Sequence, residues 1–170
     1  WTEVGCSDFE YVYEGTIDAG FGDDGLNVLS WEDETWTWGD GVLGMTATRF
    51  ELMDGLPSPA GADILFNGVD YLWVEGVGDL YVTPATVNAG SVVTHELGHV
   101  AGMDHSYTDV AATMFFAYIS GDWQRTVSGD DRRGLCETYN NGRDECTTDA
   151  ACAPLDANGM AHYCREIDGI

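Results

Sequence analysis

The chain has 170 residues, of which 44% are hydrophobic and 12% aromatic, so it can bury a core and is not a disordered segment. Thirty acidic against six basic residues give a net charge of −24, which argues against nucleic acid and anionic membranes as partners. No apolar run is long enough to span a membrane, and no signal-peptide pattern opens the sequence. Length and composition indicate one medium domain with an appendage.

The high acidic content has two interpretations. The simpler one, which we favour, is an adaptation for solubility, for example in a saline habitat. The sharper one is electrostatic steering of basic peptides, which salt would screen.

The first part of the chain predicts short elements joined by an acidic loop. Residues 1–4 resemble the end of a helix, and residues 9–13 alternate as a strand does. Residues 16–25 are rich in Gly and Asp and predict a loop. Three carboxylates of this loop, those of Asp18, Asp23 and Asp24, could hold Ca²⁺. Their spacing fits no EF-hand, so a solvated loop is the favoured interpretation.

Three further segments predict a small sheet. Residues 26–31 indicate a buried strand, and residues 43–52 alternate in hydropathy. Residues 57–61 contain two prolines and predict a turn, after which residues 62–67 form the next strand.

A helix is expected to begin at a cap formed by Thr86 or Asn88 and to run to about Ala101. His95 and His99 lie four residues apart, so they project from one face of this helix. Two imidazoles in that arrangement can bind one metal ion, and Glu96 beside them is placed to act as a base.

Gly102 can adopt a positive φ and end this helix in a sharp turn that brings back His105 as a third ligand. Three neutral imidazoles leave a tetrahedral position for water, which is typical of a catalytic zinc site. Three of the chain's four histidines fall in this window. The alternative, a buried helix with hydrogen-bonded histidines, is much less favoured.

At these residues the chain resembles the metzincin metallopeptidases and, through His105-Ser106, their matrixin family. Metzincins carry a methionine turn below the metal, and Met114 matches it. Matrixins then have a tyrosine that walls the main specificity pocket, here Tyr118, and a last helix opened by Ser-x-Asp-Asp, here residues 128–131. Ser128 and Asp131 also form a capping box for that helix, which is expected to end near Tyr139.

The resemblance implies an α+β fold of the metzincin type, with a twisted mixed sheet, an active-site helix and a C-terminal helix. It implies that the strand at residues 43–52 lines the cleft and that its backbone binds extended substrate, at Gly44, Met45 and Thr46. It also implies that Asp131 anchors the amino terminus.

Two departures from the family accompany the resemblance. The first strand and first long helix of matrixins are expected to be absent from this sequence, which begins at the tryptophan that ends that helix. Residues 68–83 contain no histidine, so no second zinc is expected, as in the simpler bacterial matrixin-like enzymes. An upstream propeptide is a further possible partner.

The five cysteines predict an oxidising environment and therefore a secreted, extracellular protein. Cys6 is expected to pair with Cys136, which would tie the start of the domain to its last helix. The other three cysteines are Cys146, Cys152 and Cys164. Two of them could form one short-range disulfide, which would leave the third as an unpaired thiol. We expect a catalytic domain at residues 1–140 and a short cysteine-rich tail at residues 141–170.

The sequence therefore predicts a secreted zinc endopeptidase acting on extended polypeptides. His95, His99 and His105 would bind one Zn²⁺, with Gly102 and Met114 in support, and Glu96 would act as general base and then acid on a zinc-activated water. Tyr118 and its apolar neighbours predict a hydrophobic or aromatic residue on the primed side of the cut. The alternative is a zinc-bound module that is latent, or that binds peptides without cleaving them.

Overall fold

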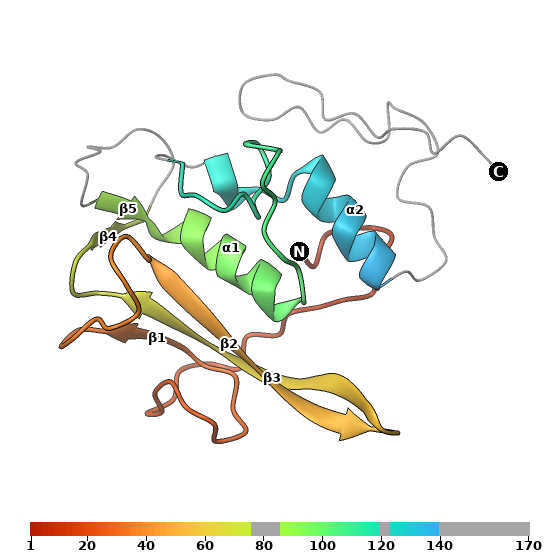
Figure 1. Ribbon diagram of the computed structural model, residues 1–170, viewed down its shortest axis with the longest axis horizontal. Helices are drawn as coiled ribbons and strands as arrows, with labels where there is room; N and C mark the ends of the chain where they lie inside the picture. The colour runs from red at the N-terminus through yellow and green to blue at the C-terminus, as the bar shows by residue number, and fades with distance from the viewer. Residues whose placement is uncertain (76–85, 120–122, 140–170) are drawn as a thin grey trace.

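The computed structural model describes residues 1–75, 86–119 and 123–139. Its central helix, α1 (Ala89–Val100), lies between a β-sheet on one side and α2 (Gly129–Thr138) on the other (Figure 1). The predicted α+β class, with a mixed sheet, a central helix and a C-terminal helix, is confirmed.

The main sheet has three strands in the order β1-β3-β2. β1 (Leu29–Glu32) runs parallel to β3 (Leu56–Asn67), and β2 (Gly44–Met53) runs antiparallel to β3. β2 is thus an edge strand of the described sheet. A second, two-stranded sheet pairs β4 (Leu72–Val74) in parallel with β5 (Thr86–Asn88), directly before α1.

The turn predicted at residues 57–61 is wrong, because those residues belong to β3. The chain reverses instead at Asp54 and Gly55, whose φ angles are 54° and 82°. An Asp-Gly pair tolerates two successive positive φ angles and so forms the two-residue hairpin turn that matches strand twist. The prolines did not mark the turn.

The expected strand at residues 9–13 is also wrong, because this segment forms no strand. Two of its aromatic side chains contact the helical part of the chain: the ring of Phe9 lies 4.9 Å from the ring of Tyr139, and the Tyr11 hydroxyl donates to the Leu97 carbonyl. Residues 1–7 form hydrogen-bonded turns in place of the expected helix end. These contacts partly bury Phe9 and Tyr11, whereas Tyr13, the third alternating aromatic residue, is 82% exposed.

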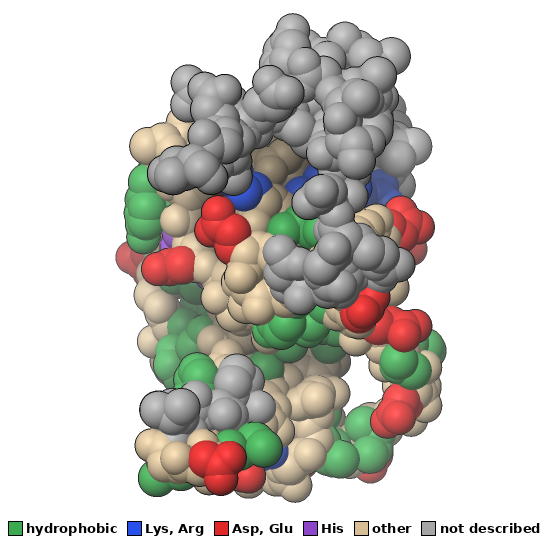
Figure 2. Space-filling view, turned by 90° about the vertical axis from the view of Figure 1, so that its right-hand side faces the viewer, with side chains coloured by type: hydrophobic (Ala, Val, Ile, Leu, Met, Phe, Trp, Pro, Cys, Tyr) green, Lys and Arg blue, Asp and Glu red, His purple; other side chains and the backbone are tan. Residues whose placement is uncertain are grey.

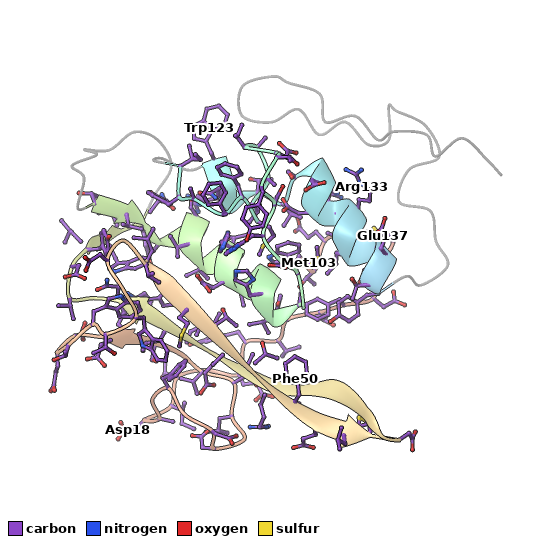
Figure 3. The ribbon with its side chains drawn as sticks, viewed as in Figure 1. Asp18, Phe50, Met103, Trp123, Arg133 and Glu137 are labelled. Atoms are coloured by element: carbon purple, nitrogen blue, oxygen red, sulfur yellow. A yellow bond between two sulfur atoms is a disulfide. The ribbon has the colours of Figure 1, made fainter. Side chains whose placement is uncertain are left out.

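Two hydrophobic clusters cover opposite sides of α1. One joins Ile64 and Phe66 of β3 to Val87 and Val92. The other joins Val4 and Cys6 to Ala101 and to Leu135 of α2, and Met103 lies in it between α1 and α2 (Figure 3). The first cluster packs α1 against the sheet, and the second joins the C-terminal end of α1 to α2 and to the start of the chain.

The predicted disulfide between Cys6 and Cys136 is confirmed, with Cα atoms 5.5 Å apart. It links residues 130 positions apart and so ties the start of the chain to α2. The predicted tail at residues 141–170 lies outside the described residues, so the expected domain boundary stays a prediction. Within the described part of the chain, no helix has the length and apolarity that a membrane crossing requires.

Acidic side chains lie at several separate places on the face drawn in Figure 2, among hydrophobic and other side chains. Asp23 forms an ion pair with Arg49, and Asp24 accepts a hydrogen bond from the Leu26 amide. Asp18 projects from the same loop (Figure 3). These contacts stabilise the loop and give no support to a calcium site there.

Candidate active site

α1 begins where the sequence predicts. The Asn88 side chain accepts a hydrogen bond from the Ser91 amide at 3.0 Å. Of the two expected candidates, Thr86 and Asn88, the N-cap is therefore Asn88. The helix then places His95 and His99 on one face, one turn apart.

The end of α1 is a Schellman turn, in which Gly102 has a φ of 82°. The amide of Gly102 donates to the carbonyl of His99 at 2.9 Å, and the amide of Met103 donates to the carbonyl of Gly98 at 3.0 Å. This is the sharp turn predicted at Gly102. It carries the chain back so that His105 meets the two helical histidines.

The three histidines converge through their ε-nitrogens. Nε2 of His105 lies 3.2 Å from Nε2 of His95 and 3.1 Å from Nε2 of His99. Nitrogens that bind zinc tetrahedrally at about 2.0–2.1 Å lie roughly 3.3 Å apart. The spacing therefore fits one zinc ion, and these residues form the one group of three or more potential metal ligands among the described residues.

Backbone carbonyls orient two of these rings from behind. Nδ1 of His95 donates to the Thr113 carbonyl at 2.7 Å, and Nδ1 of His99 donates to the Met103 carbonyl at 2.9 Å. Because a carbonyl can only accept, the proton sits on Nδ1 and the lone pair on Nε2 faces the shared site. Burial lowers the pKa of His95 to about 4, and it also lowers the pKa of His105, so both rings are neutral near pH 7.

Met114 is buried in the predicted turn beneath the histidines, with 2% of its surface exposed. Asp131 of α2 holds this turn, because its carboxylate accepts from the amides of Thr113 and Met114 at 2.8 and 3.0 Å. The same carboxylate accepts from the amide and hydroxyl of Ser128, which confirms the capping box.

These contacts change the role expected of Asp131. The resemblance implied an ion pair with the amino terminus, but both of its oxygens bind Thr113, Met114 and Ser128. Its charge therefore stabilises the turn that carries the carbonyl partner of His95. The capping box is a local sequence pattern, whereas the contacts of α2 with a distant turn leave no local signal in the sequence.

Glu96 is buried, with 5% of its surface exposed. Burial raises the pKa of its carboxyl group, against the opposing influence of a hydrogen bond from Thr46 and of nearby His99. A base with a raised pKa accepts a proton more readily near neutral pH.

A cavity of about 520 Å³ opens beside Glu96, His95 and His105. Residues 41–44 form one side and residues 115–118 the other, so the predicted Gly44 and Tyr118 both line it. Met45 and Thr46 lie on the same strand but outside the lining formed by the described residues. The Tyr118 hydroxyl also accepts from the Asn88 amide at 2.8 Å, which joins this wall to the start of α1.

Gln124 stabilises the wall of this cavity, a role that the sequence did not indicate. It is 3% exposed, and its side-chain amide donates to the carbonyls of Phe115 and Ala117 at 3.3 and 3.2 Å. Its carbonyl oxygen accepts from the Ile119 amide at 2.9 Å. No local signal marks such a residue, because its partners lie on an irregular loop.

An exposed aromatic pair lies next to the histidines. Tyr107 and Phe116 stack with ring centroids 5.5 Å apart, and Tyr107 also faces the ring of His105 at 6.1 Å. They are 67% and 53% exposed, and Phe116 lines the cavity as well. The rim of the cavity is thus apolar and open to solvent.

Comparison with known families matches the chain to a family model described as Matrixin over residues 24–140. The match covers more than half of the chain and includes the three histidines. The chain belongs to the matrixin family. Comparison with curated proteins and with solved structures yields no match. As a matrixin with three converging histidines, the protein has the features of a zinc metallopeptidase in general.

Proposed function

We propose that this matrixin is a secreted zinc endopeptidase that hydrolyses extended polypeptides. The observation that carries the proposal is the convergence of three imidazole ε-nitrogens next to a cavity that two of these histidines, His95 and His105, line together with the buried Glu96.

The donor set suits zinc, and His95, His99 and His105 would hold it. When bound, zinc acidifies a water molecule and polarises the scissile carbonyl. Glu96 takes the proton from the attacking water and passes it to the nitrogen of the leaving amine. The carbonyls of Thr113 and Met103 keep the imidazoles in the tautomer that can bind metal.

The free edge of β2 supports an extended substrate. In the described sheet β2 pairs only with β3, so the backbone groups on its other edge can bind a polypeptide as an added strand. Gly44, where β2 begins, lies at both this edge and the cavity. A bound chain can therefore run along β2 and place one side chain in the cavity.

The cavity favours a hydrophobic or aromatic side chain on the primed side. Leu43, Val92, Phe115 and Tyr118 are among its lining residues, and Glu96 is the one carboxylate that the described residues contribute to the lining. A cleavage profile dominated by charged residues at that position would contradict this preference.

Secretion is supported by the Cys6–Cys136 disulfide, since such bonds persist in oxidising compartments. Control by an upstream propeptide and a zinc-bound but silent role as a peptide-binding module remain the alternatives. The buried Glu96 favours catalysis over the silent module, because a module that only binds peptides has no need of a base.

The test is mass spectrometry of a diverse peptide mixture after incubation with the protein and with its Glu96→Ala variant. The proposal predicts cuts by the unaltered chain alone, with hydrophobic residues following the cut. If neither protein cuts while both bind zinc, the latent or silent role gains the support instead.

A further inference from the structure

Thr46 on β2 contacts Glu96 of α1 through its hydroxyl. Its Oγ1 lies 2.7 Å from Oε2 of the Glu96 carboxylate and 3.2 Å from the Glu96 backbone carbonyl. The hydroxyl has a single proton, and a carboxylate is the stronger acceptor at the shorter distance. The proton therefore goes to Oε2.

The other carboxylate oxygen lies against Gly44, two residues earlier on the same strand. A β-carbon on Gly44 would fall 2.9 Å from Oε1 and 3.2 Å from the carboxylate carbon of Glu96. Only a residue without a side chain leaves this space. Gly44 lines the cavity together with Glu96, His95 and His105, whereas Thr46 is outside the lining formed by the described residues. Of the two carboxylate oxygens, Oε1 is therefore the one beside a residue of the cavity wall.

We propose that Thr46 is a positioning residue for Glu96, holding Oε2 so that Oε1 is the oxygen that accepts the proton of the attacking water. The inference rests on the proposed peptidase function. It separates the tasks of the two oxygens, since one is anchored to β2 and the other carries the proton.

This contact couples the base to the substrate strand. Thr46 is paired in register with Ile64, a fully buried residue of β3, so its position on β2 is fixed by the core. The free edge of the same strand is where an extended substrate would bind. The same strand then positions both Glu96 and the bound peptide. Few intervening contacts are therefore needed to keep the base and the peptide in the correct relative position.

The first test compares Thr46→Val, Thr46→Ala and Thr46→Ser with a matched control, Thr48→Val. Thr48 lies two residues further along β2, and the described structure records no hydrogen bond between it and Glu96. Thr46→Val and Thr46→Ala are expected to lower kcat by roughly 10- to 100-fold with little change in KM or bound zinc. Thr46→Ser restores most of kcat, and Thr48→Val stays within about twofold. Unchanged kcat in Thr46→Val, or an equal loss in Thr46→Ser, would overturn the inference.

The second test needs no activity. Urea unfolding of the zinc-free protein is measured for Thr46→Val, Glu96→Ala and the double variant. Thr46→Val is expected to raise the equilibrium constant for unfolding about tenfold in the chain that has Glu96. In the Glu96→Ala background the same substitution is expected to raise it far less. Equal effects in both backgrounds would refute the contact. If the unaltered chain cleaves nothing, the proposed function fails, whereas the unfolding cycle still decides whether Thr46 holds Glu96.

Discussion

The sulfur of Met114 lies directly against Gly98, so that a β-carbon on Gly98 would fall 2.2 Å from it. The same β-carbon would fall 2.6 Å from Cζ2 of Trp1, whose indole nitrogen donates to the Thr94 carbonyl at 2.8 Å. Gly98 precedes the ligand His99 by one residue. The methionine turn and the first residue therefore pack together against the helix that carries two of the metal ligands.

Gly98→Ala tests this packing. Alanine favours a helix by up to about 1 kcal/mol over glycine, but here its methyl group would have to displace the buried side chain of Met114 and the partly buried side chain of Trp1. We expect a net loss of about 2 kcal/mol in the free energy of unfolding and weaker zinc binding. Urea unfolding and a zinc titration measure both. Gly22→Ala is the control, since a β-carbon there meets nothing within 4 Å; a gain of stability in Gly98→Ala would contradict the packing.

Asp131→Asn tests the link between α2 and the methionine turn. The substitution replaces an acceptor oxygen with an amide donor facing the amides of Thr113, Met114 or Ser128, and a buried amide then lacks its partner. We expect a loss of about 2–3 kcal/mol in stability and a lower zinc affinity, because Thr113 supplies the carbonyl that orients His95. Asp130→Asn, at the neighbouring exposed ion pair with Arg133, should change stability by less than about 0.5 kcal/mol. Similar losses in the two variants would refute this role of Asp131.

Local sequence patterns predict the turns and caps around the site better than they predict the surrounding fold. Helix capping by Asn88, the turn at Gly102 and the capping box at Ser128 depend on residues close in sequence, and all three are present. The roles of Asp131 and Gln124 depend on contacts between distant segments, which no local pattern encodes. The alternation at residues 9–13 resembled a strand, but Phe9 and Tyr11 are partly buried by contacts with Tyr139 and Leu97, and Tyr13 is exposed.

The zinc-free protein should lose stability as the pH falls from about 6.5 to about 4. Burial lowers the pKa of folded His95 to about 4, whereas an unfolded histidine titrates near 6.5. In this window the unfolded chain binds a proton that the folded chain does not, so acid favours unfolding by up to about 1.4 kcal/mol per pH unit. Above pH 6.5 His95 contributes no pH dependence.

Urea unfolding at pH 7.5, 6 and 5 in the presence of a chelator measures this effect. The His95→Gln variant removes the titrating group and serves as the comparison, since carboxylates elsewhere affect both proteins alike. A smaller decline in His95→Gln than in the unaltered protein is expected. Parallel declines in the two proteins would show that His95 does not titrate as its burial implies.

The central claim is that three histidines bind one zinc ion with which Glu96 hydrolyses peptides. Its most direct test removes metal with a chelator and then titrates zinc back into the unaltered protein and into Glu96→Gln, while peptide cleavage and bound zinc are followed together. We predict that cleavage by the unaltered protein rises in proportion to zinc and levels off at one ion per chain, while Glu96→Gln binds the same single ion and cleaves nothing. Cleavage by the metal-free protein, or cleavage by zinc-loaded Glu96→Gln, would contradict the account.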